Sequence, residues 1–126
     1  MAALVFDSGA LIALERGDRA IAAALVVAVA DGLEAATSSA CVAEVWRQPA
    51  RQARLTRALA GFVEHGLDPN RARACGTLIA AAGDSDLADA AICQLAGEGD
   101  VVLTSDPVDI ARLLKAGRVA ASVRHV

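Results

Sequence analysis

Four acidic side chains stand where hydrophobic segments of this chain end or are interrupted. Asp7 follows Ala-Leu-Val-Phe, and Asp106 follows Val-Val-Leu-Thr-Ser. Glu44 lies within Val-Ala-Glu-Val-Trp, and Asp89 lies within Leu-Ala-Asp-Ala-Ala-Ile. Crowded carboxylates repel one another and lose hydration, so a fold that gathers several of them normally needs a divalent cation to offset their charge. The four acids therefore predict a metal site, provided that the fold brings them together.

Short apolar runs alternate with helical patterns along the chain. The expected strands are residues 4–6, 33–37, 62–65, 101–104 and, at an edge, 119–123. The expected helices are residues 10–15, 20–30, 38 or 39 to 46, 49–60, 69–82, 85–96 and 107–115. Parallel strands need crossover connections of helix length, so this order predicts an α/β fold with a mainly parallel central sheet of four to five strands and helices on both faces. The length fits one domain, residues 1–126.

The expected sheet gives a physical reason for the acids to meet. In parallel sheets, ligands bind beyond the carboxyl ends of the strands. Asp7 and Asp106 each follow an expected strand at that end. Helix capping is the alternative: Asp7 precedes Ser-Gly, and Asp106 precedes Pro107 with Asp109 at the third helical position. One carboxylate can both cap a helix and bind a metal.

The two remaining acids have structural alternatives of their own. Glu44 lies three residues before Arg47 and could form an exposed ion pair, although its apolar neighbours favour a less exposed place. Asp84 or Ser85 would cap the helix that contains Asp89, which would put Asp89 beyond the reach of the helix dipole. Capping therefore explains Asp89 least.

Composition limits how the protein could hold nucleic acid. The formal net charge is −3 with a pI near 5.2, and aromatic residues make up 2% of the chain. Neither charge alone nor base stacking favours nucleic-acid binding, so any contact would be made with the backbone. Arginine is nevertheless clustered, with four residues in one eleven-residue stretch: Arg47, Arg51, Arg54 and Arg57.

Cysteine usage and hydropathy predict a cytoplasmic protein. Cys41, Cys75 and Cys93 are odd in number and form no Cys-x-x-Cys pair, which argues against a disulfide framework and a thiolate zinc site. Asp7 interrupts the first apolar run, so no signal peptide is expected. Residues 20–30 are the most apolar stretch, but they are shorter than the ~20 residues of a membrane-spanning helix.

The order and contexts of the acids resemble the PIN domain, and among PIN domains the VapC-type toxins of type II toxin–antitoxin systems. The resemblance covers nearly the full length and rests on Leu-Val-Phe-Asp-Ser-Gly-Ala-Leu-Ile-Ala-Leu, Val-Ala-Glu-Val-Trp and Leu-Ala-Asp-Ala-Ala-Ile. It implies that Asp7, Glu44 and Asp89 bind Mg²⁺ or Mn²⁺, directly or through supporting contacts. The fourth acid falls within Thr-Ser-Asp-Pro-Val-Asp, where Asp106 is the first candidate and Asp109 the second.

This resemblance implies a metal-dependent endoribonuclease that hydrolyses RNA phosphodiesters. It also implies a cognate antitoxin that covers the acidic cleft, and a homodimer built on helices, for which residues 20–30 are a candidate contact. No histidine or cysteine nucleophile is required, so neither His65 nor His125 is assigned a role. Two features depart from the pattern: the acidic pI is unusual for a nuclease, and Pro49 follows closely after Glu44.

Hydroxyl and guanidinium groups are candidate substrate contacts. Thr104 and Ser105 could orient a water or a phosphate oxygen, or they could cap the following helix. Arg51 and Arg54 lie along one side of the helix expected after Pro49 and could steer phosphates, as could Arg112. A solvated basic face is an equal alternative.

Other functions remain open at this point. A phosphorelay receiver also places acids around Mg²⁺, but it needs an acidic pair after the first strand and a lysine after the fifth. Asp7 has no acidic neighbour, and Lys115 lies within an expected helix. A phosphatase with an aspartate nucleophile would need a second Asp two residues after Asp7. A catalytically inactive PIN-like protein that only binds RNA is a further alternative.

Overall fold

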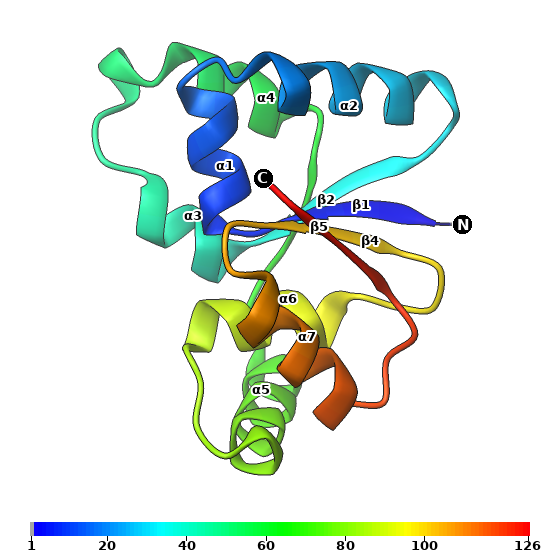
Figure 1. Cartoon of the computed structure of the whole chain (residues 1–126). Helices are drawn as coiled ribbons and strands as arrows, with labels where there is room; N and C mark the ends of the chain where they lie inside the picture. The colour runs from blue at the N-terminus through cyan, green and yellow to red at the C-terminus, as the bar shows by residue number, and fades with distance from the viewer. Residues whose placement is uncertain (1) are drawn as a thin grey trace.

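Five parallel strands form one sheet through the middle of the molecule (Figure 1). The computed structural model describes residues 2–126. Its strands are β1 (Ala3–Phe6), β2 (Glu34–Ser38), β3 (Val63–His65), β4 (Val101–Thr104) and β5 (Ser122–His125). They lie in the order β3-β2-β1-β4-β5, and each neighbouring pair is parallel. The predicted α/β class with a parallel sheet is confirmed.

Helices cover both faces of this sheet, as predicted. They are α1 (Ser8–Glu15), α2 (Arg19–Ala30), α3 (Ser39–Val45), α4 (Ala53–Ala60), α5 (Pro69–Ala82), α6 (Leu87–Leu95) and α7 (Pro107–Ala116), with a 3-10 turn η1 (Pro49–Arg51). Figure 1 shows α1, α2 and α4 on one face and α5, α6 and α7 on the other. Within residues 2–126, every helix is too short or too polar to cross a lipid bilayer.

The central strand β1 and its neighbour β4 are apolar because helices bury them on both sides. All four residues of β1 are buried, and so are the last three residues of β4. At the end of β1 the rings of Phe6 and Phe62 meet edge to face, with centroids 4.8 Å apart. The buried hydroxyl of Thr37 donates a hydrogen bond of 2.7 Å to the carbonyl of Phe6. These contacts fix the carboxyl ends of β1 and β2 relative to each other.

Asp100 fixes the strands relative to one another at the amino end of the sheet. Its side chain is buried, and its two carboxylate oxygens accept hydrogen bonds of 2.8 Å from the backbone amides of Ala3 and Gly97. Its own carbonyl accepts from the amide of Ser122. Asp100 therefore joins the starts of β1, β4 and β5, far from the carboxyl ends where a ligand is expected.

One predicted helix is broken in the structure. Residues 49–60 were expected to form a single helix, but η1 ends at Arg51 and α4 begins at Ala53. Gln52 separates them with φ −119° and ψ 40°, and its side chain is buried. That side chain hydrogen-bonds to backbone groups of three residues of the preceding segment, which local helix propensity does not reveal.

The start of α6 also differs from the prediction. Asp86 caps this helix, rather than Asp84 or Ser85, by accepting a hydrogen bond of 3.1 Å from the amide of Asp89. Asp84 instead belongs to the end of α5, because its amide donates to Ile79 and its φ is +110°. Asp89 consequently lies in the first turn of α6, so the expectation that it lies beyond the helix dipole was wrong.

The edge strand is shifted relative to the predicted residues 119–123. Val119 donates its amide to the carbonyl of Leu114 and thus belongs to the turn that ends α7. The strand pairing with β4 begins at Ser122 and extends to His125, which sits opposite Thr104. His125 is therefore a strand residue rather than part of a tail.

Candidate metal centre

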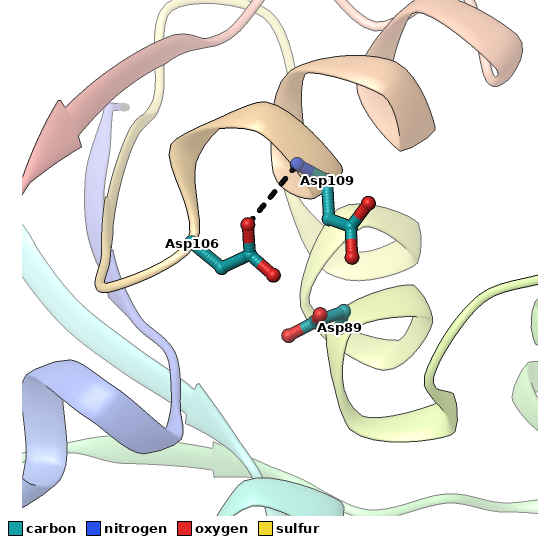
Figure 2. A group of neighbouring side chains, drawn as sticks. All are labelled: Asp89, Asp106 and Asp109. Atoms are coloured by element: carbon teal, nitrogen blue, oxygen red, sulfur yellow. Dashed lines mark hydrogen bonds between the residues drawn. The ribbon is translucent and has the colours of Figure 1, made fainter.

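Three acidic side chains converge between α6 and α7 (Figure 2). Asp89 comes from the first turn of α6, Asp106 caps α7, and Asp109 lies in the first turn of α7. One carboxylate oxygen from each residue lies within 4.8 Å of the others. The carboxylate of Asp106 also accepts a hydrogen bond of 3.3 Å from the backbone amide of Asp109. The two candidates for the fourth acid, Asp106 and Asp109, thus lie in the same cluster.

Asp7 lies beside this cluster but deeper. Its side chain is 3% exposed and caps α1 by accepting a hydrogen bond of 2.9 Å from the amide of Ala10. Burial raises the pKa of Asp7, while hydrogen bonds from Thr104 and nearby backbone amides act in the opposite direction. β1 and β4 are neighbours in the sheet, so the residues that follow them are also neighbours. The chain places β2 and β3 on one side of β1, and then β4 and β5 on the other side. Parallel sheets bind ligands at the point where the strand order reverses in this way, which here lies between β1 and β4.

The electrostatic environment of Asp89 reflects its acidic neighbours. Burial is the main cause that raises the pKa of Asp89 to about 7, and the negative charges of Asp86, Asp7, Asp106 and Asp109 contribute to the same rise. Like charges around a half-buried carboxyl disfavour its ionised form. Asp86 was not among the predicted acids of the site, and its charge is an addition to that set. The position of Asp86 three residues before Asp89, at the start of the same helix, is the sequence signal that could have revealed its influence on Asp89.

Glu44 reaches the same region from α3. It is exposed, contrary to the expectation from its apolar neighbours, because those neighbours face the core on the other side of the helix. Its carboxylate accepts a hydrogen bond of 2.5 Å from the hydroxyl of Ser8, the residue after Asp7. No ion pair joins Glu44 to Arg47 in the described part of the chain; the Arg47 guanidinium donates to the carbonyls of Ala43 and Trp46.

A buried thiol lies beneath three of these acids. The pKa of Cys41 is raised to about 12, mainly by burial; a hydrogen bond with Ser8 opposes this rise, and the negative charges of Asp7, Glu44 and Asp89 add to it. The sulfur also contacts the carbonyl of Ala88 at 3.7 Å. Carboxylates from α1, α3 and α6 therefore lie close enough to influence a single side chain, although their positions in the sequence are far apart.

The turn after β4 is held in place by Thr104 and Ser105. Thr104 is buried, and its hydroxyl accepts a hydrogen bond of 2.8 Å from the amide of Asp106. Ser105 is exposed and lies against Gly9 of α1, where an added Cβ would be 2.5 Å from the Ser105 Cβ. The turns after β1 and β4 are thus in direct contact.

The arginines predicted to bind substrate are dispersed. Arg51 is exposed on η1. Arg54 donates to the carbonyl of Glu15 at 3.0 Å and lies against Gly17. Arg112 pairs with Asp109 at 3.1 Å and donates to the carbonyl of Ala82. The single helix expected to carry Arg51 and Arg54 is interrupted at Gln52.

The donor set fits a hard divalent cation. All the converging side chains offer carboxylate oxygens, which Mg²⁺ and Mn²⁺ prefer. Among residues 2–126, Asp109 is the one acid of this region with a cationic side chain within ion-pair distance. The remaining negative charge is not balanced by ion pairs, and it adds to the effect of burial in raising the pKa of Asp89.

Comparison with known proteins yields a structural match. No family model and no curated protein matches this sequence. The fold is similar to a chain of the crystal structure of VapBC2 from Rickettsia felis bound to a DNA fragment from their promoter. The two chains share 13% sequence identity with a TM-score of 0.67, and 98% of each is covered. The resemblance to VapC-type PIN domains, predicted from the acidic motifs, is confirmed at the level of the fold.

Proposed function

We propose that this protein is a metal-dependent endoribonuclease and acts as the toxin of a toxin–antitoxin pair. The observation that carries the proposal is the cluster of Asp89, Asp106 and Asp109, whose carboxylate oxygens lie within 4.8 Å of one another. Asp7 and Glu44 flank this cluster at the carboxyl edge of a parallel sheet. The fold similarity to a chain of the VapBC2 structure supports the assignment.

The acids have different tasks in this proposal. Asp89, Asp106 and Asp109 would hold Mg²⁺ or Mn²⁺, with Asp7 adding negative charge from below. A bound ion of this kind supplies Lewis-acid chemistry: it polarises the phosphate, lowers the pKa of the attacking water and neutralises the leaving oxygen. Exposed Glu44 is held by Ser8 and can accept a proton from water at the edge of the site.

Residues of the site also set its pH dependence. The pKa of Asp89 is about 7, so a proton competes with the cation below that pH. Metal affinity should therefore increase between pH 6 and pH 8. Burial holds the pKa of Cys41 and Cys93 at about 12, so both remain neutral thiols and neither serves as a nucleophile.

The test is cleavage of RNA by purified protein with Mn²⁺, together with Mn²⁺ binding measured by electron paramagnetic resonance. Asp106→Asn should retain the α7 cap, since asparagine caps helices well, yet lose 10–100-fold or more in metal affinity and cleavage, roughly. Asp68→Asn is the matched control, because Asp68 caps α5 in the same manner outside the cluster. Absence of cleavage in excess Mn²⁺ contradicts the proposal.

The same experiment separates the alternatives. RNA binding without cleavage by the unmutated protein would indicate an inactive PIN-like RNA-binding protein. Phosphorylation of Asp7 by a small phosphodonor would indicate a receiver module. The position of Lys115 gives the receiver no support, because it is exposed in the last turn of α7.

A toxin of this kind would have an antitoxin partner, a homodimer contact and a cytoplasmic location. The outer surface of α2 is our candidate for one of the protein contacts, because Val26, Val27 and Val29 are 68%, 59% and 59% exposed. Such a patch is unusual on an isolated domain. Val27→Asp should weaken dimerisation or binding of a cognate antitoxin, measured by light scattering and by pull-down. If both are unchanged, α2 is not a contact.

A further inference from the structure

A groove lies between α1 and the segment that runs from α3 to η1. Its α1 side is lined by Ile12 and Arg16, and its other side is lined by Glu44, Arg47 and Arg51. Glu44 lies at the acidic site, because it accepts a hydrogen bond from Ser8 beside Asp7. The groove therefore leads away from the proposed metal centre toward three arginines from two separate parts of the chain.

The guanidinium groups of this groove are not neutralised by carboxylates. Within residues 2–126, none of Arg16, Arg47 and Arg51 has an acidic oxygen within ion-pair distance. Arg47 uses one terminal nitrogen to bind the carbonyls of Ala43 and Trp46, which leaves its other N–H groups. Among the residues that the structure describes, the one other acid that lines the groove is Glu15, whose carboxylate accepts a hydrogen bond from the buried Gln52.

Gln52 makes one side of the groove rigid. Its side chain is 5% exposed; its oxygen accepts from the amides of Arg47 and Gln48, and its nitrogen donates to Glu15 and to the carbonyl of Val45. All the hydrogen-bonding capacity of this amide is used within the protein. The backbone that carries Arg47 is consequently fixed before any ligand binds, which reduces the entropic cost of binding.

We propose that this groove binds the sugar–phosphate backbone of RNA next to the phosphate that is cleaved, with Arg16 and Arg51 as its principal contacts. The inference rests on the proposed ribonuclease function and names the path of its substrate. Arginine recognises phosphate through paired N–H donors, which suits two guanidinium groups on opposite sides of one groove. No aromatic side chain from the described part of the chain lines the groove. Contacts there are made with phosphates rather than bases, so they carry no sequence preference.

The test measures RNA binding without cleavage. A fluorescently labelled twelve-nucleotide single-stranded RNA is titrated in EDTA, at several salt concentrations, with the unmutated protein and with Arg16→Gln/Arg51→Gln. The double variant should bind roughly tenfold more weakly, to U-rich and A-rich RNA alike. The slope of log affinity against log salt should fall by about 1.4, corresponding to two lost phosphate contacts on a single strand.

The control is Arg73→Gln/Lys115→Gln, which removes the same charge from exposed positions on α5 and α7. It should change neither the affinity nor the slope by a comparable amount. Arg16→Lys/Arg51→Lys should recover part of the binding, because the charge is retained. Thermal unfolding and Mn²⁺ affinity of the glutamine variant should match those of the unmutated protein.

Several outcomes overturn the inference. If the glutamine variant and the unmutated protein bind RNA equally, the groove does not bind RNA, and a peptide becomes its candidate ligand. Equal losses in the groove variant and the control would point to net charge alone. A loss of Mn²⁺ affinity would place the defect in the acidic cluster. A different outcome would contradict the proposed ribonuclease function but not the groove: RNA binding would depend on Arg16 and Arg51, yet no RNA would be cleaved in Mn²⁺.

Discussion

Gly9 and Ser105 bring the turns after β1 and β4 into direct contact. A Cβ at position 9 would lie 2.5 Å from the Cβ of Ser105 and 3.3 Å from its backbone nitrogen. The first distance is too short for any real contact, and the second is tighter than most contacts of a Cβ atom. The absence of a side chain at Gly9 therefore permits Asp7 and Asp106, which flank these residues, to approach the same site.

Gly9→Ala should weaken the site and the fold together. The added methyl group must push the two turns apart, and overpacking of this kind costs ~1–3 kcal/mol. Urea unfolding measures the stability, and Mn²⁺ titration measures the site. Gly76→Ala is the control, because Gly76 lies within α5 with no atom near its missing Cβ. It should increase stability by ~0.5–1 kcal/mol and leave Mn²⁺ affinity unchanged. Unchanged Mn²⁺ affinity in Gly9→Ala would contradict the close-contact argument.

Asp89→Asn should stabilise the metal-free protein at high pH. The pKa of Asp89 is about 7 in the folded protein and ~3.9 in an unfolded chain. Between these values the folded state holds a proton that the unfolded state has lost, so this contribution to stability is complete below pH ~4 and is lost as the pH rises through 7. Asparagine removes the charge repulsion that appears above pH 7.

The expected gain at pH 8 in EDTA is ~1 kcal/mol, because solvent screens a half-buried carboxylate. For a chain of this length that corresponds to an increase of ~3–5 °C in Tm. At pH 5 the two proteins should melt at nearly the same temperature. Asp68→Asn, which changes an exposed capping residue, should show no such difference. The same Tm gain at both pH values would rule out a titration effect.

The sequence predicts those elements whose ends are set by local patterns. The strand at residues 101–104 and the helix at 69–82 are predicted with the observed bounds, because an apolar run and a proline mark them. The break at Gln52 was missed, since it depends on a side chain that bonds to Val45 and Glu15 across a turn. The edge strand was misplaced because pairing with β4 sets its register.

Local patterns in the sequence also predicted the acidic residues at the strand ends. Apolar runs that end in a carboxylate predicted Asp7 and Asp106, and the structure places both at the carboxyl ends of adjacent strands. Whether Asp106 or Asp109 belongs to the cluster could not be decided from spacing, and both do. Arg16 was not singled out, because only the packing of α1 against the segment after α3 places it beside Arg51.

Gln52→Ala should destabilise the segment between α3 and α4. The substitution leaves the part-buried amides of Arg47 and Gln48 and the buried carbonyl of Val45 without their present partners, at a cost of ~2–4 kcal/mol in total. Chemical denaturation measures this loss. Gln48→Ala is the matched control: Gln48 is exposed, and its substitution should change stability by less than ~0.5 kcal/mol. Comparable effects from both substitutions would contradict the role given to Gln52.

Asp100→Ala should lower the stability of the fold without changing its affinity for Mn²⁺. Its carboxylate joins β1 to the turn before β4 at the amino edge of the sheet, so its removal leaves two backbone amides without acceptors and costs ~2–4 kcal/mol. At temperatures where the variant is folded, its Mn²⁺ affinity should equal that of the unmutated protein. Glu98→Ala, an exposed change in the same turn, should affect neither property. A selective loss of Mn²⁺ affinity in Asp100→Ala would link the two edges of the sheet.

The strand order has a consequence for biosynthesis. β4 lies next to β1 in the sheet although almost a hundred residues separate them, so Asp106 is synthesised long after Asp7. Any nascent chain or prematurely terminated product that stops before β4 therefore has an incomplete set of acids.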